Sequence, residues 1–194
     1  MPVQLDFPDP PLAAAPVILR RLTSEDLTWI TAACSDREMS RYSPAIPHPY
    51  TQAHAHAFAA QTAQGWADGT SATFVIARPS NGEGAGIIEL DLGPADPGRA
   101  GVGYWLRPEE RGCGAATTAL RLVAGWAFET LGIERLDLTT DPENQPSQRV
   151  AERAGFTREG LLRSWLPTPD GRRDRLIYSL LADEPSAVPM RARP

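Results

Sequence analysis

The sequence predicts a mixed α/β fold, in which one twisted and mostly antiparallel sheet carries helices on both faces. Three observations support this prediction. Short apolar segments typical of strands outnumber the segments with helical spacing. Asn81-Gly82 and Asp170-Gly171 are pairs that favour tight turns between antiparallel strands. With 194 residues, the chain is long enough for one domain with a full hydrophobic core.

The first elements follow from their polar and apolar patterning. Val17–Leu22 is a short apolar run and is expected to form the first strand. Thr23 or Ser24 is expected to cap a helix that continues to about Ala33, because acidic residues occupy its first turn.

A proline-rich segment, Ser43–Tyr50, then predicts an irregular loop. We expect a second helix from Thr51 to about Trp66. Turn residues at Asn81-Gly82 and in the segment 93–98 separate the next strands. These strands are expected at Thr73–Arg78, Ala85–Asp91 and Ala100–Leu106.

The longest helix is expected over about Gly114–Leu131, with Gly132 as its C-terminal cap. One stripe of this helix is apolar at helical spacing and should face a core; it consists of Leu120, Val123, Ala124, Ala127, Phe128 and Leu131. A strand at Arg135–Thr140 and a short helix at Pro146–Ala154 follow. Two last strands should flank the Asp170-Gly171 turn.

Charge and cysteine content narrow the class of protein. A net charge of −5 argues against nucleic-acid binding, which usually requires a basic face. The two cysteines, Cys34 and Cys113, cannot form the disulfide framework of a small secreted protein. No basic residue precedes Arg20, and no apolar run approaches the length of a membrane span. We therefore expect a cytoplasmic protein that does not bind membranes.

The segment 102–116 joins an apolar strand to a helix through a glycine-rich turn. Gly112, Gly114, Ala115 and Ala116 are small, so that a ligand can approach the backbone itself. Backbone N–H groups and the positive end of the helix dipole would converge on that ligand. The segment therefore predicts an anion site, most naturally for a phosphate.

Two common phosphate-binding motifs fit this segment less well. All 19 basic residues are arginines, so the chain lacks the lysine of a Walker loop and cannot form a lysine Schiff base. Gly112 and Gly114 supply two glycines of the dinucleotide motif, but Thr117 occupies the third position. That motif also belongs to a first strand–turn–helix unit, whereas half of this chain precedes the turn.

The same turn, Arg111-Gly112-Cys113-Gly114-Ala115-Ala116, resembles the arginine/glutamine-x-x-glycine-x-glycine/alanine signature of the GNAT acetyltransferases. A second segment, with Asn144, Ser147 and Gly155-Phe156, is similar to the asparagine-x-x-serine and glycine-phenylalanine segment of that superfamily. The strand 103–106 resembles its RimJ/RimL branch, which acetylates α-amino groups of ribosomal proteins and has relatives acting on other amines.

This resemblance implies a GNAT acyltransferase fold over residues 16–183 and acetyl-CoA as the co-substrate. The turn Arg111–Ala116, Cys113 included, would hold the pyrophosphate, and backbone N–H groups near Leu106 would polarise the acetyl carbonyl. Asn144 would bond the pantetheine arm or the thioester region, and Ser147 would be a general acid. From the residues alone, the alternative for Asn144 is a turn residue and for Ser147 a helix cap, a role that is compatible with catalysis.

The general base is less evident. Members of the branch often carry a glutamate two residues before the Gly-Tyr-Trp-Leu strand core, where this chain has Gly101. Glu89 and Asp91 lie two apart on the preceding strand and point to the same face. We expect Glu89 to act as the base; the alternative is a solvated carboxylate or one that binds a substrate cation.

The segments outside the domain, 1–15 and 184–194, are rich in proline and alanine and are expected to be a loose arm and tail. Three histidines and two distant cysteines offer little for a metal site, so no metal is expected. Trp66, Trp165 and Tyr42 are expected either at an acceptor cleft or simply at loop edges.

The sequence thus predicts an acetyl-CoA-dependent N-acetyltransferase whose preferred acceptor is a protein or peptide α-amino group. One alternative is a small amine, such as an antibiotic or polyamine. Another is an inactive acyl-CoA-binding sensor, which Gly101 would favour and the Asn144/Ser147 segment disfavours. The family resemblance also implies a possible homodimer.

Overall fold

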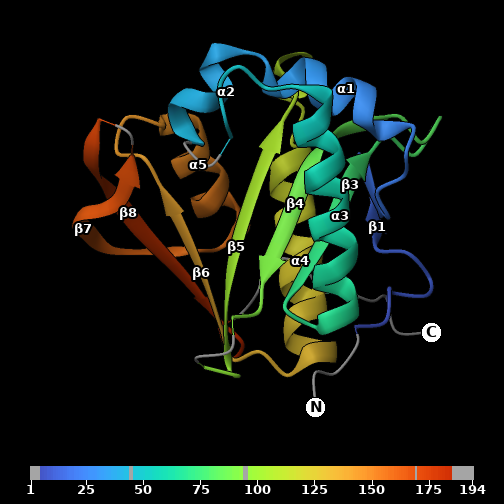
Figure 1. The fold of residues 1–194 in the computed structure, drawn as a ribbon. Helices are drawn as coiled ribbons and strands as arrows, with labels where there is room; N and C mark the ends of the chain where they lie inside the picture. The colour runs from blue at the N-terminus through green and yellow to red at the C-terminus, as the bar shows by residue number, and fades with distance from the viewer. Residues whose placement is uncertain (1–4, 44–45, 94–95, 169, 185–194) are drawn as a thin grey trace.

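The computed structural model describes residues 5–43, 46–93, 96–168 and 170–184. One eight-stranded sheet runs through these residues in the order β1-β2-β3-β4-β5-β6-β8-β7 (Figure 1). Neighbouring strands are antiparallel except β5 and β6, which are parallel. The strands are β1 Ala13–Ala14, β2 Val17–Arg20, β3 Ser71–Ala77, β4 Gly84–Asp91, β5 Arg99–Leu106, β6 Arg135–Thr140, β7 Thr157–Thr168 and β8 Gly171–Leu181.

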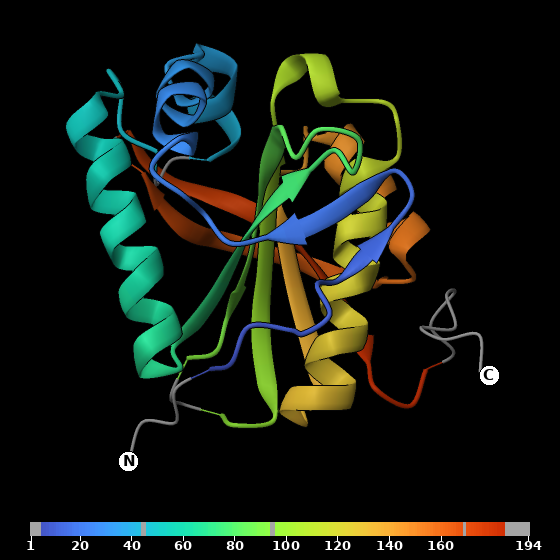
Figure 2. The same ribbon diagram turned by 90° about the vertical axis from the view of Figure 1, so that its right-hand side faces the viewer.

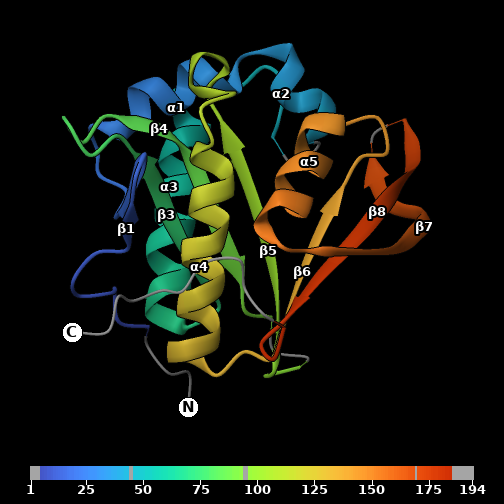
Figure 3. The same cartoon turned by 180° about the vertical axis from the view of Figure 1, so that it is seen from behind.

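Helices cover both faces of this sheet, as the sequence predicts. Figure 2 shows α3 and α4 on opposite sides of the strands, and Figure 3 shows α5 on the same side as α4. Figure 1 shows α2 near the end of the sheet where β5 finishes. The helices are α1 Asp26–Cys34, α2 Arg37–Tyr42, α3 Gln52–Asp68, the 3-10 turn η1 Pro108–Glu110, α4 Ala115–Leu131 and α5 Gln145–Ala154.

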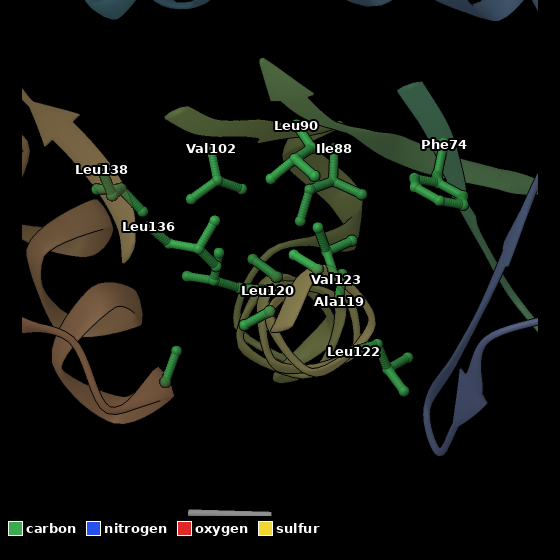
Figure 4. Packing of buried hydrophobic residues seen from close by; sticks show 14 of the residues in the cluster. Phe74, Ile88, Leu90, Val102, Ala119, Leu120, Leu122, Val123, Leu136 and Leu138 are labelled. Carbon is green, nitrogen blue, oxygen red and sulfur yellow. The ribbon is translucent and has the colours of Figure 1, made fainter. Parts of the chain in front are cut away.

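The largest core lies between the sheet and α4. Figure 4 shows Ile88 and Val102 of the strands facing Leu120 and Val123 of the helix. The stripe predicted for this helix is thereby confirmed: its first four members are almost fully buried and the last two partly buried. Gly132 closes α4 with a left-handed φ of 67°, a conformation that glycine adopts without strain.

The start of α1 corrects the expected cap. The helix begins at Asp26 after Glu25, and no side chain caps it. Neither Thr23 nor Ser24 acts as predicted; the buried Asp26 carboxylate instead accepts hydrogen bonds from the N–H and hydroxyl of Thr23 at 2.9 and 3.1 Å. The Thr23 hydroxyl therefore donates to the Asp26 carboxylate and does not accept an N–H of the helix, as a cap would.

The N-terminal arm is not loose over residues 5–15. The N–H of Leu5 donates to the carbonyl of Trp66 at 3.0 Å, and the Phe7 ring packs on Trp66 and Phe74 at 5.5 and 5.4 Å. Strand β1 then pairs with β2. Apolar side chains within this proline-rich segment anchor it, while residues 1–4 and 185–194 lie outside the described part of the chain.

Candidate functional site

Strands β5 and β6 separate part-way along their length. They pair only at Arg99–Arg135, Ala100–Leu136 and Gly101–Asp137. The N–H of Arg107 donates to the carbonyl of Ala85 on β4 at 2.9 Å. Because successive residues of a strand direct their N–H groups to opposite sides, this bond shows which residues of β5 face β4. Odd-numbered residues bond β4, so the N–H groups of Tyr104 and Leu106 point into the opening beside β6.

The turn after β5 is shaped by two glycines and by an ion pair between a buried glutamate and an exposed arginine. Gly112 and Gly114 have left-handed φ angles of 82° and 85°, and a Cβ on either would meet nothing within 4 Å. Glu110 is buried and accepts from Nε of Arg78 at 3.1 Å, with a second contact from Nη2, which holds η1 in place. Gly114 has no side chain to cap α4, so no cap of that kind uses the N–H groups of its first turn.

A cavity of about 270 Å³ lies between this turn, the strand opening and α5. We call it the first cavity. Of the residues predicted for the cofactor, all but Cys113 line it; the Cys113 side chain turns back and its thiol donates to the carbonyl of Glu110 at 3.2 Å. The lining consists of Glu38, Met39, Tyr42, Ser43, Tyr104, Trp105, Leu106, Arg111, Gly112, Gly114, Ala115, Ala116, Thr117, Asn144, Pro146, Ser147, Val150 and Arg153.

Helix α2 contributes a wall that sequence reasoning did not predict. Nη1 of Arg111 lies 2.9 Å from Oε2 of Glu38, and its Nε donates to the Leu106 carbonyl at 3.4 Å. Asp36 caps the helix by accepting the N–H of Glu38 at 3.0 Å. This cap is a sequence signal that could have revealed α2. Its Tyr42 lines the first cavity, whereas Trp66 is buried in the core and Trp165 is exposed.

Ser147 meets a tyrosine that sequence reasoning missed. The hydroxyl of Tyr104 lies 3.1 Å from Oγ of Ser147. The helix cap belongs to Asn144, whose Oδ1 accepts the N–H of Ser147 at 3.1 Å, so the serine hydroxyl is not used for capping. Burial raises the pKa of Tyr104 to about 12, although the bond with Ser147 opposes this shift. The tyrosine is therefore protonated at neutral pH.

Glu89 does not share a cavity with Ser147. It lines a second cavity, of about 460 Å³, on the sheet face covered by α1 and α3. Its Oε2 accepts from the hydroxyl of Thr73 at 2.7 Å. Asp91 is exposed and does not line this cavity. The second cavity is formed by Ile30, Cys34, Ile46, Pro47, Tyr50, His54, Ala57, Phe58, Gln61, Thr62, Ser71, Glu89 and Trp105.

Among the lining residues that the structure describes, Trp105 alone belongs to both cavities. Its ring packs against Trp29 at 5.8 Å, and Nε1 of Trp29 donates to Asp26 at 2.8 Å. Over the described ranges, no three histidine, cysteine or acidic side chains gather as a metal site would require. The described helices also include none with the length and apolar character of a membrane span.

Known proteins resemble this chain in sequence and structure. A family model for the acetyltransferase (GNAT) domain matches residues 17–157. The uncharacterized N-acetyltransferase p20 of Bacillus licheniformis is 27% identical over 167 residues, covering 86% of this chain and 93% of that protein. The spermidine N(1)-acetyltransferase of Escherichia coli (strain K12) is 28% identical over 159 residues, 77% of each chain.

Among solved structures, Mycobacterium smegmatis RimJ in complex with CoA-disulfide has a TM-score of 0.76 to this chain. The two are 24% identical, and the match covers 86% of this chain and 82% of that one. This likeness shows a shared fold. It agrees with the predicted mostly antiparallel sheet flanked by helices.

Proposed function

The chain belongs to the GNAT acetyltransferase family, and from this premise we propose that it moves the acetyl group of acetyl-CoA to the α-amino group of a protein or peptide. The observation that carries the proposal is the opening between β5 and β6 beside the turn at Gly112 and Gly114. Backbone donors converge there from a strand and from a helix start, as an acyl carbonyl and a pyrophosphate require.

The residues present fit acetyl-CoA. The two left-handed glycines leave their outer side free, and the first-turn N–H groups of α4 suit a pyrophosphate. In this proposal the N–H of Leu106 bonds the acetyl oxygen, and the amide of Asn144 lies within reach of the pantetheine arm. Acetyl-CoA supplies an activated thioester, whose carbonyl carbon is open to attack by an amine.

Each proton in the transfer has a proposed carrier. Glu89 accepts a proton from the incoming ammonium group, directly or through water, and the C–N bond then forms as the C–S bond breaks. Ser147 donates its proton to the departing sulfur while Tyr104 keeps a hydrogen bond to the serine oxygen. The nitrogen then gives up its second proton, which returns to Ser147 through water. An ammonium acceptor loses two protons in total; one ends on the thiol and one in solvent.

The preference for an α-amine follows from the proton requirement. An α-ammonium has a pKa of about 7.7–8.0, whereas a lysine side chain has about 10.4. Deprotonating a lysine side chain at neutral pH therefore costs about 3.5 kcal/mol more than deprotonating an α-ammonium group. Gly101 leaves the site without a carboxylate at the position where the RimJ/RimL branch often has one. Glu89, which lines the second cavity, then takes the role of the base in this proposal.

A small amine is the second candidate. It is favoured by the similarity to spermidine N(1)-acetyltransferase, which extends over 77% of both chains. The two candidates differ in the charge and size of the acceptor, so one assay separates them.

The test is thiol release from acetyl-CoA with peptides that have free α-amines, peptides with lysine as the only amine, and spermidine. Release with the α-amine peptides alone supports the proposal. Faster release with spermidine selects the second candidate. Tight acetyl-CoA binding without release from any acceptor would indicate an inactive sensor.

Ser147→Ala refines this test. We expect the variant to retain acetyl-CoA affinity within about twofold and to lose about 100-fold in kcat, as is typical when a general acid is removed. Unchanged turnover would remove Ser147 from the mechanism.

A further inference from the structure

The second cavity lies between α1, α3 and strands β3 to β5, on the face opposite Ser147. We propose that it holds the acceptor and selects a primary amine with one positive charge on an otherwise uncharged, hydrogen-bonding body. This inference rests on the acetyl transfer proposed above. It adds the class of acceptor, and it assigns a binding role to Thr62.

The charge of the cavity is the first argument. Glu89 is its one acidic residue among the described lining, which contains no arginine. The His54 ring also lines the cavity, and its Nδ1 accepts the N–H of Thr51 at 3.1 Å. Burial raises the pKa of Cys34 and of Tyr50 to about 12, which keeps both uncharged. One carboxylate is thus available to meet one ammonium group.

An unsatisfied hydroxyl is the second argument. Thr62 lies within α3, is 6% exposed and lines the cavity, yet its Oγ1 has no hydrogen-bond partner in the described part of the chain. A buried hydroxyl without a partner is costly, and native proteins rarely leave one. A polar group on the acceptor would satisfy it, at a position on the opposite side of the cavity from the sheet strands.

A route from Glu89 toward the opening between the strands is the third argument. Glu89 pairs with Gly103 across β4 and β5, and a Cβ on Gly103 would meet nothing within 4 Å. The strand therefore presents no side chain beside the carboxylate. An amine bound at Glu89 lies beside the same strand that directs the Leu106 N–H into the opening.

These features disfavour polyamines. A second or third ammonium group that enters this cavity loses its hydration and finds no further carboxylate among the described lining. The apolar side chains of Ile30, Ile46 and Phe58 instead suit an uncharged body. The first residue of a peptide meets these conditions, because its amide groups are uncharged and can bond Thr62.

The experiment compares an uncharged tripeptide amide with a free α-amine against spermidine, using thiol release from acetyl-CoA. We expect kcat/KM to be at least about tenfold higher for the tripeptide. Glu89→Gln should lower that value at least about tenfold. Thr62→Val, which preserves shape, should raise KM several-fold with kcat unchanged, because the hydroxyl lies away from the reacting carbon. Asp91→Asn is the matched control and should behave as wild type.

Three results would overturn the inference: a higher kcat/KM for spermidine, equal losses in Asp91→Asn and Glu89→Gln, or a KM within twofold of wild type in Thr62→Val. Failure of the proposed function has a different signature, namely no thiol release from any acceptor although acetyl-CoA binds. In that case calorimetry on protein saturated with CoA still tests the inference about the second cavity. The affinity for the tripeptide must exceed that for spermidine, and it must be lower in Thr62→Val than in wild type.

Discussion

The hydroxyl of Tyr104 on β5 lies 3.1 Å from Oγ of Ser147 on α5, across the opening where β5 and β6 separate. Because Tyr104 is protonated at neutral pH, it can donate to the serine oxygen and leave the serine proton free for transfer. Tyr104→Phe should therefore lower kcat by about three- to tenfold, the usual effect of one hydrogen bond. Steady-state kinetics with acetyl-CoA and a peptide acceptor measure this.

The affinity for acetyl-CoA serves as the control for Tyr104→Phe and should stay within about twofold of wild type. The pH dependence of kcat adds a second readout. If Tyr104 had only a structural role, the alkaline limb of this profile would be the same in Tyr104→Phe and in wild type. If the phenylalanine variant turns over at the wild-type rate, Tyr104 has no part in orienting Ser147.

Asn144 should influence stability more than Ser147 does. Its Oδ1 caps α5 by accepting the Ser147 N–H, whereas the serine hydroxyl bonds only Tyr104 among the described side chains. Asn144→Ala should lower the free energy of unfolding by about 1 kcal/mol, the common cost of a lost cap. Ser147→Ala should cost clearly less. Urea denaturation of both variants checks the order, and a reversed order would contradict the capping assignment.

Gly114 offers a test of the phosphate turn with a matched control. Gly114 and Gly82 both have left-handed φ angles, 85° and 72°, and a Cβ added at either position would meet no atom within 4 Å. Alanine at either position should cost about 1–2 kcal/mol of stability. Gly114→Ala alone should also weaken acetyl-CoA binding, by about tenfold or more, because its Cβ occupies the outer side of the turn.

Calorimetric titration with acetyl-CoA measures this difference. Equal affinities for the two alanine variants would show that the turn does not hold the pyrophosphate.

The ion pair between Arg20 and Asp26 predicts an acid-sensitive part of the stability. Burial alone would raise the pKa of Asp26, but hydrogen bonds from Arg20, Thr23 and Trp29 outweigh it and lower the pKa below its ordinary value of 3.8. A lowered pKa means that the unfolded chain binds more protons, so this stability is present above about pH 3.8 and is lost as the pH falls through the lowered pKa.

Asp26→Asn should therefore cost about 2–3 kcal/mol at neutral pH, since it leaves Arg20 without its carboxylate. The difference from wild type should shrink below pH 3.8, and exposed Glu25→Gln should show no comparable loss. Urea denaturation across this pH range checks both statements. A difference that stays constant with pH would mean that the ion pair is not the cause.

Local patterns predicted most of the fold. Alternating or continuous apolar runs predicted the strands. Apolar residues at helical spacing predicted α4, and the glycine that follows them predicted its end at Gly132. The short helix α2 was missed because six residues leave too little periodicity. The expected cap at Thr23 or Ser24 failed because a buried ion pair at Asp26 controls that turn.

The lining of the first cavity was predicted where one segment forms it and missed where distant segments meet. The turn from Arg111 to Ala116 could be read from its own residues. The pairing of Tyr104 with Ser147 joins positions 43 residues apart, and the contact of Arg111 with Glu38 joins positions 73 apart. Such contacts depend on how β5, α2 and α5 pack, which no local pattern specifies.

Trp105 as the common wall of the two cavities has an evolutionary consequence. The two cavities are otherwise lined by different side chains. Substitutions on α1 and α3 can therefore reshape the second cavity while the turn that begins α4 stays intact. Under the proposed assignment of the second cavity to the acceptor and the first to acetyl-CoA, new acceptors can be explored one mutation at a time without loss of the acyl donor. Trp105 itself is the most constrained position in this respect, because a substitution there changes the lining of both cavities.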